Sequence, residues 1–176
     1  MKLLKILLEQ EKILVPRRIK DREKNLARVT QQKIQQYIKD GSKGNLDLKG
    51  TPITSLPDNL KYVRGSLYLS YTGITSLPDN LKVEKDIFLQ NTPITSLPNN
   101  LKHVAGTLNL IDSSIASLPD DLKVDGHLLI QGSAIDSLPK NLYVIGVFDI
   151  RKTPLAEKYS NSEIKKAAYI RSGIYR

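Results

Sequence analysis

The sequence predicts an α/β repeat solenoid of six parallel strands, with extended, non-helical return legs and a helical cap at each end. The tripeptide Ser-Leu-Pro occurs five times, and its serines are 21, 20, 21 and 20 residues apart. A constant period of this length is typical of a stacked array in which each unit buries its apolar side against its neighbours. Within each unit, apolar and polar residues first alternate with a period of two, and a proline follows. The alternation indicates a strand, and the proline indicates a non-helical return.

Each predicted strand carries two inward apolar residues separated by one outward residue. These pairs are Leu46/Leu48, Leu67/Leu69, Ile87/Leu89, Leu108/Leu110, Leu128/Ile130 and Phe148/Ile150. Because the pairs recur at the repeat period, the strands should stack as parallel rungs about 4.8 Å apart.

The return legs contain Pro57, Pro78, Pro98, Pro119 and Pro139. Proline lacks an N–H and fixes φ, so a helix is not expected there. Asp-Asn pairs beside two of these prolines supply turn-forming side chains. The return legs are therefore predicted to be extended or turn-like.

The chain ends differ from the repeats and define the predicted domain organisation. Residues 1–43 form a basic N-terminal helical cap, because Ile19, Leu26, Val29 and Ile34 recur at roughly helical spacing. Residues 44–155 form the solenoid. Residues 156–176 form a C-terminal helical cap, whose helix begins near Glu163 and runs to Gly173. An open stack of strands needs such caps because its ends expose apolar rungs and strand edges.

The repeat Leu-x-Leu-x-x-Thr-x-Ile-x-x-Leu-Pro resembles the leucine-rich repeat family over residues 44–155. That family usually has asparagine where this chain has hydroxyl residues, and the difference predicts a hydroxyl ladder in place of an amide ladder. The hydroxyl residues are Thr51, Thr72, Thr92, Ser113, Ser133 and Thr153. The motif Ser-Leu-Pro-Asp-Asn-Leu-Lys is similar to motifs of short-repeat proteins from bacteria and tailed phages. This resemblance implies a viral or bacterial interaction protein, with a host protein, such as a component of host defence, as its partner.

Composition excludes several classes of protein. The chain has no cysteine, so it has no disulfides, thiolate metal sites or cysteine nucleophiles. A reducing cytoplasm, of a bacterium or of an infected host cell, is the expected location. No segment approaches the roughly 18 apolar residues of a membrane span. The start, MKLLKILL, is interpreted as a short amphipathic helix rather than a signal peptide.

The formal charge of +9 is concentrated in the flanks. Residues 1–40 hold 11 Lys/Arg and 5 Asp/Glu, residues 41–155 hold 11 of each, and residues 156–176 hold 5 and 2. Six basic side chains form the densest cluster: Arg17, Arg18, Lys20, Arg22, Lys24 and Arg28. These could neutralise phosphates. However, Asp21 and Glu23 interrupt the cluster and no aromatic residue interleaves with it, so a solvated helix face is the competing interpretation.

The outward residues of the strands predict a binding surface. The polar rungs at both ends flank an apolar middle, formed by Tyr68, Tyr71, Phe88, Ile111 and Leu129. Exposed apolar patches with aromatic anchors mark protein contact sites. Scattered strand-favouring side chains, or cover by the N-terminal helix, would account for the same pattern without a partner.

Catalysis has little support in the sequence. His103 and His127 are the only histidines, and no nucleophile motif accompanies either. The Asp/Asn turns lack the glycine-rich calcium-repeat pattern. We therefore expect no catalytic residues, no metal and no cofactor.

The leading hypothesis is a non-catalytic module that binds a protein through its strand face, as a monomer or a weak homo-oligomer. One alternative is a nucleic-acid-associated protein that uses the basic flanks. Another is a structural protein that self-associates through its Leu-rich start.

Overall fold

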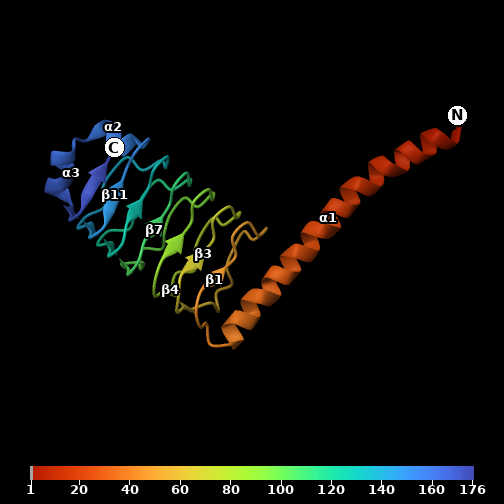
Figure 1. Cartoon of the computed structure of the whole chain (residues 1–176), viewed down its shortest axis with the longest axis horizontal. Helices are drawn as coiled ribbons and strands as arrows, with labels where there is room; N and C mark the ends of the chain where they lie inside the picture. The colour runs from red at the N-terminus through yellow and green to blue at the C-terminus, as the bar shows by residue number, and fades with distance from the viewer. Residues whose placement is uncertain (1) are drawn as a thin grey trace.

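The chain folds as a stack of parallel β-coils that follows one long helix (Figure 1). The structure, a computed structural model, describes residues 2–176, with side chains for Ile19 and for residues 21–176. Helix α1 (Lys2–Lys39) leads into the first coil and extends away from the stack (Figure 1). The two short C-terminal helices lie at the opposite end of the stack. The fold is thus a parallel-strand β-solenoid with little helix in its coils.

One continuous parallel sheet forms what we call the front face. Its strand order is β1-β3-β5-β7-β9-β11-β13. The strands are β1 (Leu46–Asp47), β3 (Leu67–Tyr68), β5 (Ile87–Phe88), β7 (Leu108–Asn109), β9 (Leu128–Leu129), β11 (Val147–Asp149) and β13 (Gly173–Tyr175). The apolar pairs of the sequence lie inside, since Leu67 and Leu69 are fully buried and the other units repeat this arrangement.

The return legs form a second surface, the return face. It consists of a two-stranded sheet, β2 (Tyr62–Val63) and β4 (Lys82–Val83), and a four-stranded sheet, β6 (His103–Val104), β8 (Lys123–Val124), β10 (Tyr143–Val144) and β12 (Tyr169–Ile170). No helix lies in the return legs between residues 44 and 153. Their valines point inward and are buried, so the two faces share one core.

The C-terminal end differs from the prediction. A helix does begin where expected, because Ser160 caps α3 (Asn161–Ala167) in a capping box with Glu163. It ends at Ala167 rather than Gly173, and β12 and β13 then extend both sheets. The front sheet therefore has seven strands, not six. A further helix, α2 (Pro154–Lys158), precedes α3 and is capped by Thr153.

Neighbouring coils are joined by a ladder of side-chain acceptors just before each front strand. In this joint ladder, one side chain of each coil accepts the backbone N–H of the equivalent residue in the next coil. The steps are Asn45 to Ser66 (2.8 Å), Ser66 to Asp86 (3.4 Å), Asp86 to Thr107 (2.7 Å), Thr107 to His127 (3.4 Å) and His127 to Val147 (3.0 Å). The predicted hydroxyl ladder does not form. Each hydroxyl that bonds donates within its own coil, to the carbonyl three residues earlier, at 2.5–2.7 Å.

Among the described side chains of α1, those near its C-terminal end pack on the solenoid. Ile34 is fully buried in the core, Tyr37 and Ile38 pack against it, and Lys33 donates to the Asp47 carbonyl. Ile19, Leu26 and Val29, which the helical spacing predicted to help cover the first coil, are instead 53, 48 and 49% exposed. The reason is geometric, because a straight helix touches the coil only over its last turns.

Candidate functional site

The front face brings its outward side chains into columns, because each strand pairs with the next in constant register. The central column reads Asp47, Tyr68, Phe88, Asn109, Leu129, Asp149 and Tyr175. The neighbouring column, two residues further along each strand, reads Lys49, Ser70, Gln90, Ile111, Gln131 and Arg151. Charged residues lie in the end coils, while the four middle coils present none in either column. In these two columns the centre is therefore uncharged, while Asp86 in the column before the strands and Asp112 in the turn after them border it.

The five predicted contact residues are brought partly together. Tyr68 and Phe88 occupy adjacent strands and stack, with ring centroids 4.9 Å apart and planes at 5°. Asn109 separates them from Leu129 in the same column, and Ile111 lies in the neighbouring column. Tyr71 is 56% exposed, whereas the other four are only partly exposed. The five side chains therefore do not form one continuous, fully exposed apolar patch.

Tyr71 lies in a column of residues with left-handed backbone, at the turn that follows each front strand. The column is Gly50, Tyr71, Asn91, Asp112, Gly132 and Lys152, with φ between 51° and 69°. Where the turn closes by a backbone bond, as from Thr51 N–H to the Leu48 carbonyl, this is the pattern of a type II turn. Glycine, asparagine and aspartate tolerate this conformation, whereas tyrosine and lysine adopt it at a cost. Tyr71 is therefore held in a strained backbone, with the Lys49 ammonium 5.6 Å from its ring.

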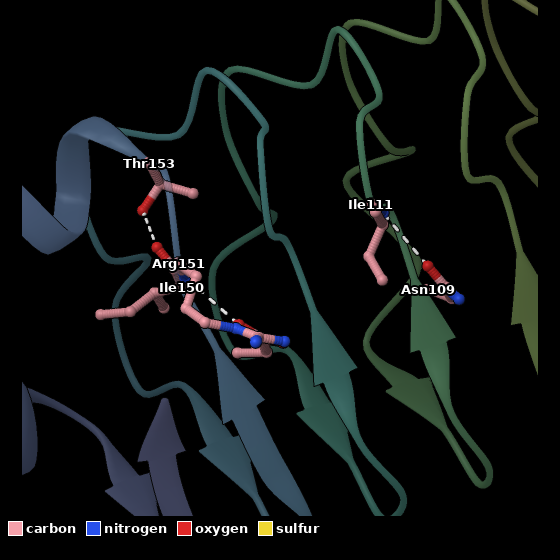
Figure 2. A network of polar contacts seen from close by, with 6 residues as sticks. Asn109, Ile111, Ile150, Arg151 and Thr153 are labelled. Carbon is pink, nitrogen blue, oxygen red and sulfur yellow. Dashed lines mark hydrogen bonds and ion pairs between the residues drawn. The ribbon is translucent and has the colours of Figure 1, made fainter. Parts of the chain in front are cut away.

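The polar residues of the central column fix the strand ends. Asn109 Oδ1 accepts the Ile111 N–H at 3.1 Å, and Asp149 Oδ1 accepts the Arg151 N–H at 3.2 Å (Figure 2). Arg151 also forms a two-point ion pair with Asp149, at 2.9 and 2.6 Å. Burial raises the pKa of Asp149, but hydrogen bonds from Arg151 outweigh it and hold that pKa below its ordinary value. An ion pair thus borders the uncharged middle coils, and the exposed Tyr175 on β13 lies beyond it.

Gln90 lies at the centre of the front face, one coil from Ser70 and from Ile111. Its Oε1 atom is buried and has no hydrogen-bond partner among the described residues. A buried acceptor without a partner costs free energy, so such an atom in a native structure calls for an explanation. Because this atom has less than 1 Å² of accessible surface, a bound molecule could donate to it only after the side chain turns outward.

The return face was missed by the sequence analysis as a candidate surface. Its outward column reads Tyr62, Lys82, His103, Lys123, Tyr143 and Tyr169. The signal was present in the sequence, since each of these residues precedes the inward Val or Ile that closes a coil, buried at the five valines and partly buried at Ile170. It was obscured because the charge of the repeats sums to zero.

The basic stretch of α1 falls only partly within the described residues. Arg22, Lys24 and Arg28 are exposed, and Arg28 donates to Asn25 at 3.1 Å. The side chains of Arg17, Arg18 and Lys20 lie outside the described residues. Asp21, Lys24, Asn25 and Arg28 line an open hollow of about 390 Å³.

The two histidines lie on different faces and have structural partners. His103 Nε2 is 2.8 Å from Asp125 Oδ2, and this hydrogen bond is the largest cause of a lowered pKa at Asp125. His127 Nδ1 accepts the Val147 N–H, as part of the joint ladder. Within residues 2–176 as described, no three His, Asp or Glu side chains gather where they could hold a metal ion. Nor does any helix in this part of the chain combine the length and apolar content that a membrane span requires.

Fold and surface together define a β-solenoid repeat protein with two chemically different faces. Neither a protein-family model nor a curated protein matches the chain.

Proposed function

We propose that this chain is a non-catalytic interaction module of the leucine-rich repeat type, with helices capping its two ends, and that its front face binds a protein. The stacked Tyr68–Phe88 pair, on the first two of the four uncharged middle coils, carries the proposal. Protein interfaces concentrate aromatic anchors in a centre depleted of charge and keep charged residues at the rim. Asp47 and Lys49 at one end and the Asp149–Arg151 ion pair at the other supply that rim.

Two further observations support the same surface. Tyr71, in the same coil as Tyr68, keeps a bulky ring on left-handed backbone, where glycine or asparagine would be unstrained. Gln90 offers a buried acceptor without a partner among the described residues. Strain and unsatisfied polarity both cost stability, and a bound partner that uses the ring and the amide would account for retaining them.

The resemblance of the Ser-Leu-Pro repeats to short-repeat proteins of bacteria and tailed phages extends the proposal. The partner is then a host protein, such as a defence component, and the binding takes place in the cytoplasm. This extension rests on the resemblance, whereas the binding surface rests on the geometry of the front face.

The test compares matched aromatic-to-aspartate changes on the two faces. Wild type, a Tyr68→Asp/Phe88→Asp variant and a Tyr62→Asp/Tyr169→Asp variant are used to capture proteins from nuclease-treated bacterial lysate. A captured protein is then purified and its affinity for each variant is measured by calorimetry. The front variant should weaken binding at least 30-fold, the loss typical of a central anchor, while the return variant should leave it unchanged. Equal affinity for wild type and the front variant would contradict the proposal.

A further inference from the structure

The return face carries a column in which aromatic and basic side chains are interleaved. Tyr62 pairs with Lys82 across neighbouring coils, and His103, Lys123, Tyr143 and Tyr169 continue at the same position. Five of the six are exposed, and Tyr143 is partly exposed. Strand pairing aligns Tyr62 with Lys82 and, in the second sheet, His103 with the three residues that follow it, while the two parts of the column meet at the unpaired step between β4 and β6.

The rings are held in place by their neighbours in the column. Tyr143 and Tyr169 stack, with centroids 4.4 Å apart and planes at 8°. The Lys82 ammonium lies 5.8 Å from the Tyr62 ring centroid, and the Lys123 ammonium lies 5.7 Å from that of Tyr143. Tyr62 and Tyr169 nevertheless remain 49 and 51% exposed. Both ends of the column therefore present ring surface to solvent.

The return face is basic, although the repeats as a whole are neutral. Further cations accompany the column: Arg64, Lys102, Lys165, Lys166 and Arg171. Glu84 and Asp125 oppose them, and Asp125 pairs with His103 and Lys123. Asp58 and Asp79 lie at the proline turns, whereas Asp121, also at such a turn, forms an ion pair with Lys102 at 3.8 Å, and the Asp120 carbonyl accepts from the same ammonium at 2.7 Å. Within the repeats, the return face thus keeps a small excess of cations, and Lys165, Lys166 and Arg171 of the basic C-terminal flank add to it.

Two open grooves lie along this face. One, of about 400 Å³, is lined by Lys82, Lys102 and His103 where the return sheet is interrupted between β4 and β6. The other, of about 560 Å³, is lined by Tyr143, Tyr169, Lys165 and Lys166. Both grooves combine cations with aromatic or imidazole rings.

We propose that the return face binds single-stranded nucleic acid, independently of the protein-binding front face. Sites for single strands combine a basic track for the phosphates with aromatic rings on which bases stack, and this face has both. From Tyr62 to Tyr169 the column crosses five coil-to-coil steps, roughly 24 Å at about 4.8 Å each. At about 3.4 Å, the rise per nucleotide of a strand stacked as in a duplex, that length takes about seven nucleotides at most, and a more extended strand takes fewer. Paired bases in a duplex could not stack on the tyrosines, so single strands bind more tightly.

The experiment measures fluorescence anisotropy of labelled 12-nucleotide oligo(dT) and oligo(rU) with the full chain, between about 50 and 200 mM salt. A Tyr62→Ala/Tyr169→Ala variant should weaken binding at least tenfold, and a Tyr62→Trp/Tyr169→Trp variant should restore it. A Lys82→Gln/Arg171→Gln variant should lower the slope of log affinity against log salt by about 2. The matched front-face changes Tyr71→Ala and Lys49→Gln/Lys152→Gln should alter neither quantity. Unchanged circular dichroism and melting temperature confirm that each variant is folded.

Four results would overturn the proposal. The first is that no binding is measured at the lowest salt. The second is that the front-face control variants lose as much affinity as the return-face variants. The third is that only an Arg22→Gln/Arg28→Gln variant loses affinity, which would assign the binding to α1. The fourth is equal affinity for a duplex or for heparin with no effect of the tyrosine changes, which would indicate a general polyanion surface.

Discussion

The front and return faces are built by the same coils around the same core, yet they differ in regularity and in charge. The front sheet is one uninterrupted series of seven strands, whereas the return sheet is divided between β4 and β6. At that division, the Lys102 backbone N–H donates to the Asn100 carbonyl in its own coil. One coil further on, the Lys123 backbone N–H donates to the Lys102 carbonyl of the previous coil, as sheet pairing requires. The extra residue of the 21-residue units also lies on the return leg, as in Leu60-Lys61-Tyr62-Val63 against Leu81-Lys82-Val83. Length variation is therefore absorbed on the return face.

This difference shows how one repeat can present two surfaces. The strands of the front face keep a constant register, so their outward side chains form columns that include the stacked aromatic rings. The return face tolerates irregularity and collects the cations. Three changes test this contrast, beginning with the one expected to affect stability most.

The largest effect is expected where the two faces join. Gly126 lies in the bend between β8 on the return face and β9 on the front face. A Cβ atom there would lie 2.5 Å from the Gly106 carbonyl carbon, so Gly126→Ala should lower the free energy of unfolding by about 2–3 kcal/mol. Gly173→Ala is the matched control, because its Cβ would meet nothing within 4 Å, and it should change stability by less than about 0.5 kcal/mol. Urea unfolding followed by circular dichroism measures both, and equal effects would mean that the coils are not closely packed at Gly126.

The ion pairs of the two faces should respond differently to substitution and in the same direction to acid. The pKa values of Asp149 and Asp125 are both lowered by their partners, so each carboxylate stabilises the fold above its ordinary pKa of about 4, and this stability is lost as the pH falls through the lowered value. Asp149→Asn should cost about 1–2 kcal/mol at pH 7, because its side chain is 5% exposed and asparagine keeps the turn bond seen at Asn109. Asp125→Asn, at 28% exposure, should cost less than about 1 kcal/mol.

Urea unfolding between pH 3 and pH 7 measures this prediction. Both variants should show a weaker loss of stability below pH 4 than wild type. If Asp125→Asn proves more costly than Asp149→Asn, the return face depends on its charges more than the front face does.

The smallest expected effect is a gain in stability. Tyr71→Asn places at this turn the residue found at position 91, where φ is 55°, and should raise the free energy of unfolding by about 0.5–1 kcal/mol through relief of backbone strain. The same change should weaken binding of the front-face partner, because it removes an exposed ring. Lys152→Asn is the control, with a similar gain in stability and no loss of the partner. A loss of stability in Tyr71→Asn, measured by urea midpoint, would show that the ring contributes more than the strain costs.

The inner columns of the coils could be predicted from the sequence because their spacing reflects burial. Leu67, Leu69 and Ile74, like their equivalents, are buried as the alternation and the period indicated. Strands β12 and β13 could not be predicted in this way. Helices α2 and α3 lengthen the last unit, so Tyr169 follows Tyr143 by 26 residues and no Ser-Leu-Pro tripeptide marks the return. Alanines 167 and 168 also favour a helix, and pairing with β10 and β11 outweighs that preference.

The candidate site was predictable in its position and not in its exposure. The alternation placed Tyr68 and Phe88 on the outer face, but their stacking, which partly buries both rings, depends on the register between strands. The left-handed conformation of Tyr71 was hidden for a different reason. Four of the six equivalent positions carry Gly, Asn or Asp, and tyrosine does not suggest such a turn. The basic character of the return face could not be predicted in this way. It arises from where the charges lie in the folded structure, and a sum of charges along the chain does not contain that information.

The joint ladder has a consequence for how such a chain can evolve. Its acceptors include an amide at Asn45, a hydroxyl at Ser66, a carboxylate at Asp86 and an imidazole at His127. Each accepts the backbone N–H of the equivalent residue in the next coil. Any of these chemistries completes the joint, provided that the residue before the next strand leaves room, since a Cβ atom at Gly65 or Gly106 would clash with the acceptor oxygen of Asn45 or Asp86. Whole units could therefore be duplicated or deleted by recombination. Both faces would then become longer or shorter, while the hydrogen bonds that join neighbouring coils are kept.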